Sequence, residues 1–142
     1  MSVYQPTLDR ITVFVVGTDG HLHDKYWNGK AWVWENQGAP SGGIGNGLGT
    51  LYQPTTGFVI AFVGGGNGHL YDVYFDGKVW TWEDQGVPPG TTLTGGFSWG
   101  GLSAVYQSKP DRPVVFVVGA NGHLLDKYWD GKAWVWEDQG TP

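Results

Sequence analysis

The sequence has no cysteine, which excludes a disulfide framework and any chemistry that depends on a thiolate. Basic residues are also scarce: eight Lys and Arg stand against 13 Asp and Glu, and the net charge is −5. The few positive charges are scattered along the chain, whereas a nucleic-acid groove needs clustered Lys and Arg to neutralise phosphates. We therefore expect no nucleic-acid partner.

Long hydrophobic runs are missing as well. The longest apolar stretches span only a few residues, far short of the roughly 20 that cross a bilayer as a helix. No stretch near Met1 resembles a signal peptide. The sequence thus predicts a soluble protein that does not span a membrane, and it leaves the location open, with secretion or action at a cell surface included.

Glycine and tryptophan are plentiful, with 25 and nine of the 142 residues. Glycine suits tight turns, because it adopts positive φ at no steric cost, and tryptophan provides large, rigid aromatic surface. The length fits a single domain that spans residues 1–142 and has its own hydrophobic core.

One stretch of 19 residues occurs three times, at 20–38, 68–86 and 122–140. The first copy matches the third at 16 of 19 positions and the second copy matches it at 14. Such identity marks a tandem repeat. We place the three repeats at about 1–40, 41–88 and 89–142.

Each repeat divides into four short extended segments. The first ends in Tyr-Gln, the second is β-branched and apolar, and the third and fourth make up most of the repeated stretch. The second segment is too short for a typical helix and has no helical period, so we predict a strand that is buried on both faces. The predicted strands are 2–5, 11–16, 21–27 and 30–35 in the first repeat, with equivalents beginning at 48, 58, 69 and 78 and at 102, 113, 123 and 132.

Asp-Gly or Asn-Gly separates the second strand from the third, and the third from the fourth, in every repeat. These dipeptides favour the type I′ hairpin, whose two central residues both take positive φ. Six hairpin signals in register predict an antiparallel meander.

Glycine-rich segments at 41–51 and 89–105 connect the repeats. We expect each to provide a connection and the start of the next first strand, with small residues at a crowded axis; a plain flexible linker is the alternative. The second segment contains Gly96-Phe97-Ser98-Trp99-Gly100, a G-x-S-x-G sequence. That motif acts only on a strand–turn–helix elbow, so an all-β context argues against a nucleophile.

Tandem four-stranded meanders of this length indicate an all-β protein, a β-propeller with three blades in the chain. Propellers usually close with four to eight blades, and three blades leave two interfaces exposed. We therefore predict a homodimer that completes a six-bladed ring. A fragment of a longer propeller and a designed repeat protein are the alternatives.

The pattern of an apolar strand, an Asn/Asp-Gly turn and Leu-x-Asp-x-Tyr-Trp-Asp-Gly-Lys-x-Trp resembles the blades of β-propeller lectins. Both the fucose-binding type and the tectonin or Photorhabdus-lectin-like type are similar. In the fucose-binding type, one blade contributes an arginine and a glutamate, and its neighbour contributes tryptophans. The resemblance places the arginine at Val13, Ala61 and Val115. Valine and alanine cannot replace a guanidinium clamp, so the resemblance implies glycan binding without that clamp.

The residues support carbohydrate binding on their own terms as well, since sugars stack C–H faces on aromatic rings and need polar partners for their hydroxyls. The resemblance and this chemistry together select one acidic and three aromatic positions in each repeat. The predicted sugar-binding residues are Asp24, Asp72, Asp126, Trp27, Phe75, Trp129, Trp32, Trp80, Trp134, Tyr26, Tyr74 and Tyr128.

Each of these residues also has a purely structural interpretation. The tryptophans suit packing between sheets, above all Trp34, Trp82 and Trp136, and the aspartates suit hydrogen bonds that support turns. Apart from His21 and His23 in the first repeat, each histidine is alone in its repeat, and no cysteine accompanies any of them, so we predict no metal site and no cofactor.

Identical copies suit repeated binding sites better than one asymmetric active site. We therefore predict a multivalent lectin rather than an enzyme. A structural or protein-interaction propeller, including a designed scaffold, is the alternative.

Overall fold

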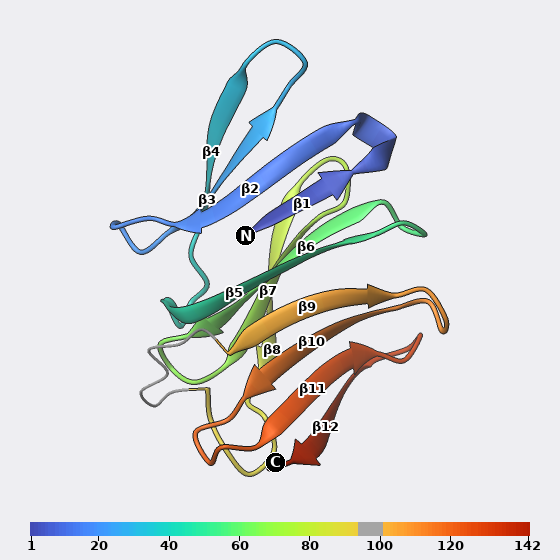
Figure 1. Ribbon diagram of the computed structural model, residues 1–142. Helices are drawn as coiled ribbons and strands as arrows, with labels where there is room; N and C mark the ends of the chain where they lie inside the picture. The colour runs from blue at the N-terminus through green and yellow to red at the C-terminus, as the bar shows by residue number, and fades with distance from the viewer. Residues whose placement is uncertain (94–100) are drawn as a thin grey trace.

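The computed structural model describes residues 1–93 and 101–142 (Figure 1). Within these residues, 12 strands form three four-stranded antiparallel sheets, each in sequential order. We call the sheets blade 1, blade 2 and blade 3.

Blade 1 consists of β1 (Ser2–Gln5), β2 (Arg10–Val16), β3 (Leu22–Trp27) and β4 (Trp32–Gly38). Blade 2 consists of β5 (Ile44–Gln53), β6 (Phe58–Gly65), β7 (Leu70–Phe75) and β8 (Trp80–Gly86). Blade 3 consists of β9 (Leu102–Gln107), β10 (Arg112–Val118), β11 (Leu124–Trp129) and β12 (Trp134–Gly140).

The predicted meander is confirmed in all three repeats, with modest differences at the strand ends. The fourth strands begin at the tryptophan rather than at the preceding lysine, and they continue to the final glycine of the repeated stretch. A short 3₁₀-helix, η1 (Pro6–Leu8), joins β1 to β2. The described part of the chain contains no helix long and apolar enough to cross a membrane.

The hairpin turns differ from the predicted type I′ geometry. A type I′ turn needs positive φ at both central residues, and Gly29 has φ 91°. Asn28 does not have positive φ, because Asp9 is the only non-glycine residue with positive φ among those described. Instead the Asn28 side-chain oxygen accepts hydrogen bonds from the backbone N–H groups of Lys30 and Ala31, both at 2.9 Å. The asparagine therefore stabilises the turn through its side chain, and this interaction does not require positive φ.

The first strands of the blades lie innermost, and β5 runs beside both β1 and β9 (Figure 1). Gly49 on β5 is required by this approach, because a Cβ there would lie 2.5 Å from Leu102 Cδ2 and 3.0 Å from the Ala104 backbone nitrogen. The expected crowding by small residues is thus present at the inner edge. The prediction that the segment 41–51 starts the next first strand is also confirmed, because β5 begins at Ile44. Residues 94–100 of the second linker, which contain the G-x-S-x-G sequence, lie outside the described residues.

The hydrophobic core lies between neighbouring blades, not within one of them. Phe14 of blade 1 meets Trp80 of blade 2 edge-to-face at 5.7 Å between ring centroids. Phe62 of blade 2 meets Trp134 of blade 3 in the same way at 5.9 Å. Because the geometry repeats, each blade presents one face to the next blade, and we call the face that carries Phe14, Phe62 or Phe116 its forward face.

The second strands are not all buried on both faces, and for blade 1 that prediction is wrong. Every residue of β6 after Phe58 is buried, because blade 2 lies between the other two blades. On β2, Ile11 and Val15 are 49% and 38% exposed. Blade 1 has no described neighbour on its rear face, so that half of the alternating pattern stays in contact with solvent.

Candidate inter-blade binding sites

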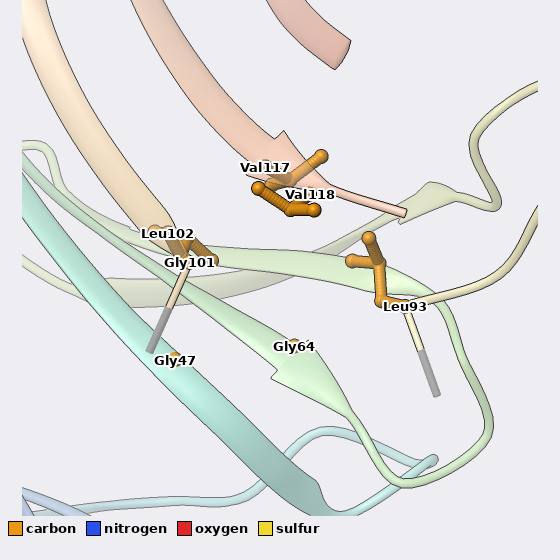
Figure 2. A pocket seen from close by; sticks show the side chains of 7 residues that line it. All are labelled: Gly47, Gly64, Leu93, Gly101, Leu102, Val117 and Val118. Atoms are coloured by element: carbon orange, nitrogen blue, oxygen red, sulfur yellow. The ribbon is translucent and has the colours of Figure 1, made fainter. Parts of the chain in front are cut away.

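A small cavity lies near the inner ends of blades 2 and 3 (Figure 2). Three glycines and four aliphatic side chains line it: Gly47, Gly64, Gly101, Leu93, Leu102, Val117 and Val118. Its volume is about 20 Å³, which is enough for about one water and too small for an organic ligand. The apolar lining makes it a packing defect.

A larger pocket lies between blades 2 and 3, with a volume of about 270 Å³. Blade 2 contributes a carboxylate and a tyrosine of β7, Asp72 and Tyr74, and blade 3 contributes Trp129 and Trp134. The structure thus brings together, from two blades, four residues that the sequence selected for one site. Gln53, Thr56, Phe58, Ile60, Glu83 and Pro113 complete the lining.

The aspartates of the third strands are the most buried of the predicted site residues. Asp24, Asp72 and Asp126 are 1%, 2% and 5% exposed, and each accepts a hydrogen bond from the glutamine 13 residues later, at 2.6, 2.7 and 2.7 Å. Each aspartate is therefore held by a glutamine of the neighbouring fourth strand, rather than by a turn as the structural interpretation expects. Asp72 also lines the pocket, so at that junction the two interpretations are compatible.

Burial raises the pKa of two of these carboxyls, Asp24 and Asp72. Desolvation raises the pKa of Asp24, and it raises the pKa of Asp72 to about 7, although the Gln85 hydrogen bond and nearby Lys127 act in the opposite direction. The negative charge of Glu83 adds to the rise. At neutral pH Asp72 is therefore divided between its acid and its carboxylate form.

The tyrosines lie beside the aspartates on the forward face and have different partners in different blades. Tyr26 and Tyr128 donate hydrogen bonds to Glu35 and Glu137 at 3.0 and 2.9 Å. These bonds raise the pKa of both phenols, because ionisation would place two negative charges together. Tyr74 instead stacks on Phe58 at 5.4 Å with an interplanar angle of 12°.

The tryptophans lie on the opposite, rear face of each blade, and their surroundings depend on the blade. Trp80 and Trp134 are partly buried against the preceding blade, whereas Trp27 and Trp32 are 39% and 48% exposed. Phe75, Trp80 and Trp82 pack on the core that includes Phe14. The two predicted aromatic positions on the rear face thus have a neighbouring blade in blade 2 and in blade 3, but not in blade 1.

The three tryptophans expected in the core do not share one environment. Trp82 is partly buried, and its indole N–H donates a 2.7 Å hydrogen bond to the Gln37 carbonyl of the preceding blade. Trp136 is partly buried under the Lys127 ammonium at 4.8 Å. Trp34 is 56% exposed, so its assignment to the core is wrong for the chain by itself.

The arginine position derived from the motif is corrected by the strand register. Val13 pairs with Lys25 and therefore lies on the rear face, away from Asp24. Guanidinium groups are nevertheless present on the forward face. Arg10 lies 4.6 Å from the Tyr26 ring, and Arg112 lies 4.1 Å from the Tyr128 ring.

Arg10 and Arg112 could have been found from one signal in the sequence. Each comes five residues after the glutamine that ends the first strand, and each donates a 2.8 Å hydrogen bond to that glutamine, Gln5 or Gln107. The equivalent position in blade 2 is Phe58, the first residue of β6. Two of the three forward faces therefore carry a guanidinium, and one carries a phenyl ring.

In blades 2 and 3, a histidine directly before the third strand pairs with an aspartate of the fourth strand, and none of these residues lines the two pockets. His69 lies 2.9 Å from Asp84, and His123 lies 2.9 Å from Asp138. Within residues 1–93 and 101–142, no group of three or more His, Asp or Glu side chains is arranged to hold a metal ion.

Comparison with known proteins gives structural matches only. The sequence matches no protein-family model and no curated protein sequence. The SapL1 lectin, solved with α-methyl fucoside, superposes with a TM-score of 0.71 at 18% identity over 96% of this chain and 44% of that chain. The six-bladed β-propeller lectin of Aleuria aurantia superposes with a TM-score of 0.68 at 19% identity, over 94% of this chain and 43% of that chain. A fucose lectin from Kordia zhangzhouensis, solved with methyl-fucoside, superposes with a TM-score of 0.60 at 14% identity, over 99% of this chain and 98% of that chain.

These matches establish the fold as a partial β-propeller of three blades. The chain spans less than half the length of the SapL1 and Aleuria lectins and nearly the full length of the Kordia lectin. The NanB sialidase of Streptococcus pneumoniae also matches, with a TM-score of 0.67 at 14% identity over 98% of this chain and 23% of that chain. The fold is therefore shared by lectins and by an enzyme, and function has to be argued from the sites.

Proposed function

We propose that this protein is a non-catalytic, carbohydrate-binding lectin whose sugar sites lie at the junctions between blades. The observation that carries the proposal is the pocket of about 270 Å³ in which Asp72 and Tyr74 of one blade face Trp129 and Trp134 of the next. Indole rings suit the C–H faces of a sugar, and the carboxylate and phenol suit its hydroxyls. The fucoside-bound lectins with the same fold support this assignment.

Every blade contributes the same kinds of side chain to its junctions. The forward face contributes the aspartate and tyrosine, and the rear face of the following blade contributes the aromatic pair at the positions of Phe75 and Trp80. At the junction of blades 1 and 2, Arg10 adds guanidinium donors within 5.8 Å of the Phe75 ring. Bidentate donors of this kind suit vicinal hydroxyls, which supports a role for arginine in sugar binding at that junction.

A second copy of the chain would complete the remaining junctions. The rear face of blade 1 exposes Tyr4, Ile11, Trp27, Trp32 and Trp34. Their equivalents in blade 2 pack on the forward face of blade 1, as Trp80 does on Phe14. The forward face of blade 3 presents Phe116 in the equivalent position. We therefore propose a head-to-tail homodimer with six blades, in which this face covers the exposed rear face of the other copy.

Closure of the ring would also complete two half-sites. Tyr4, Asp9, Ile11, Trp27 and Trp32 line a pocket of about 340 Å³ on the rear face of blade 1. The forward face of blade 3 presents the complementary set of Arg112, Asp126 and Tyr128. Each site between copies would thus combine the tryptophans of one copy with the arginine of the other, and the ring would display several similar sites for multivalent binding.

Titration of tryptophan fluorescence tests the lectin function. α-Methyl fucoside and a panel of neutral monosaccharides are added to the native protein and to Trp129→Ala. We expect saturable binding of at least one sugar and a loss of affinity in the variant; Lys132→Ala, on an exposed hairpin, is the matched control. The absence of a response to every sugar would favour the scaffold alternative, and hydrolysis of a glycoside would contradict the non-catalytic assignment.

A further inference from the structure

The three forward faces differ at one position that controls charge, the first residue of the second strand. Arg10 and Arg112 occupy it in blades 1 and 3, and Phe58 occupies it in blade 2. At the junction of blades 1 and 2, the Arg10 guanidinium lies 4.6 Å from the Tyr26 ring and 5.8 Å from the Phe75 ring. That junction therefore holds a cation between aromatic rings, and the cation belongs to the protein itself.

At the junction of blades 2 and 3, the aromatic surroundings remain but the guanidinium does not. The Phe58 ring stacks on Tyr74, and the pocket of about 270 Å³ opens between this pair and the indoles of Trp129 and Trp134. None of the residues that line this pocket is a lysine or an arginine. The junction is thus an aromatic box with two carboxylates, Asp72 and Glu83, on its wall.

A lysine near this box is already engaged elsewhere. The Lys127 ammonium donates a hydrogen bond to the Gln85 carbonyl and lies 4.8 Å from the Trp136 ring. Desolvation lowers its pKa, while Asp72 and Asp84 act to raise it. Although Lys127 partly offsets the charge of Asp72, the pKa of Asp72 remains raised to about 7. A positive charge inside the pocket would therefore stabilise the Asp72 carboxylate.

We propose that the pocket between blades 2 and 3 binds an organic ammonium group, which occupies the place that the Arg10 guanidinium takes at the preceding junction. Trp129 and Trp134 hold the cation through their π faces, and Asp72 and Glu83 supply the opposite charge. A choline-type headgroup and an amino sugar both carry this group. The inference rests on the inter-blade site of the proposed lectin, but it does not require that neutral sugars bind there.

The test compares choline with 3,3-dimethylbutan-1-ol, its uncharged isostere, by titration of tryptophan fluorescence at pH 8 and constant ionic strength. We expect choline to bind about 30-fold more tightly, because a desolvated cation–π contact adds roughly 2 kcal/mol. Equal affinities, or no saturable binding of choline, would overturn the proposal. A second pair, glucosamine and glucose, shows whether a sugar can carry the cation: preference for glucosamine supports the amino-sugar source, and saturable choline binding without it supports the headgroup.

Phe58→Arg is the matched variant, because Arg10 and Arg112 show that this position accommodates arginine in the same fold. It should abolish choline binding by filling the box with the protein's own guanidinium, and unchanged choline affinity would contradict the proposed position of the cation. α-Methyl fucoside serves as a separate readout. If fucoside binds and choline does not, the ammonium site fails while the lectin function stands. If choline binds and neither fucoside nor any other sugar of the panel does, the lectin function fails while the ammonium site stands.

Discussion

The indole N–H of Trp82 in blade 2 donates a 2.7 Å hydrogen bond to the backbone carbonyl of Gln37 in blade 1. This bond joins the fourth strands of two blades, β8 and β4. The junctions between blades are thus held by polar contacts as well as by aromatic packing.

Trp82→Phe should lower the free energy of unfolding by about 1–2 kcal/mol, because the Gln37 carbonyl loses its donor while the ring volume is largely retained. Urea denaturation measures the change. Val79→Ala, on the exposed hairpin beside β8, is the control and should shift the midpoint far less. Equal effects of the two substitutions would contradict a specific role for this hydrogen bond.

Asp72 should make stability fall as the pH rises from about 4 to about 7. Its pKa is raised from 3.8 to about 7 in the folded chain, so within this window the folded state binds more protons than the unfolded state. Asp72→Asn keeps an oxygen that accepts from Gln85 and removes the titration. The free energy of unfolding of the variant minus that of the native protein should therefore be larger at pH 8 than at pH 4.

Asp76→Asn is the contrasting control for this pH dependence. Hydrogen bonds from the backbone N–H groups of Val79 and Lys78 lower the pKa of Asp76, so its contribution to stability is present above pH 4 and is lost as the pH falls through its folded-state pKa. Urea midpoints at pH 3, 5 and 8 distinguish the two aspartates. A pH profile of Asp72→Asn parallel to that of the native protein would rule out titration of Asp72.

Choline binding should strengthen as the pH rises through about 7, because Asp72 then becomes a carboxylate. The charged groups that act on Asp72 are Glu83 and Lys127. Choline itself keeps its charge over this range, so the change reports the protein. Calorimetric titration at pH 5.5 and 8 measures the difference, and a flat profile would show that Asp72 does not face the bound cation.

Trp32→Ser should convert the proposed dimer to a monomer without loss of the blade structure. Trp32 is 48% exposed in the single chain, and its counterparts Trp80 and Trp134 pack edge-to-face on phenylalanines of the preceding blade. Phe116→Ala on the opposite end should weaken the same contact. Native mass measurement checks both variants, with Val79→Ser as an exposed control outside the junction.

A double-mutant cycle tests whether Trp32 and Phe116 meet across two copies. If they do, the fold increases in the dimer dissociation constant caused by the two single substitutions should multiply to more than the fold increase of the double variant, because the second substitution removes a contact already lost. Independent effects would argue against this pairing. A native protein that stays monomeric at high concentration would refute the six-bladed dimer itself.

The local features of the fold were predictable from particular residues. Alternation of apolar and polar side chains has the period of a strand, and Asn28-Gly29 ends one strand and starts the next through contacts only a few residues apart. Asp24 and Tyr26 could be assigned to one face by the same alternation. The placement of Asp72 near Trp129 followed from the repeat and the lectin resemblance, because equivalent blades meet in equivalent ways.

The sequence by itself determined the repeat, the four strands of each blade and the residues that share a face, since all of these depend on neighbours along the chain or within one sheet. The tertiary structure decided what each face meets. Nearly identical stretches put Trp34 in solvent and Trp82 against Gln37, and they leave Trp32 exposed but pack Trp134 against Phe62. Burial, charge and space at these positions come from the adjacent blade, which the pattern within a single repeat does not contain.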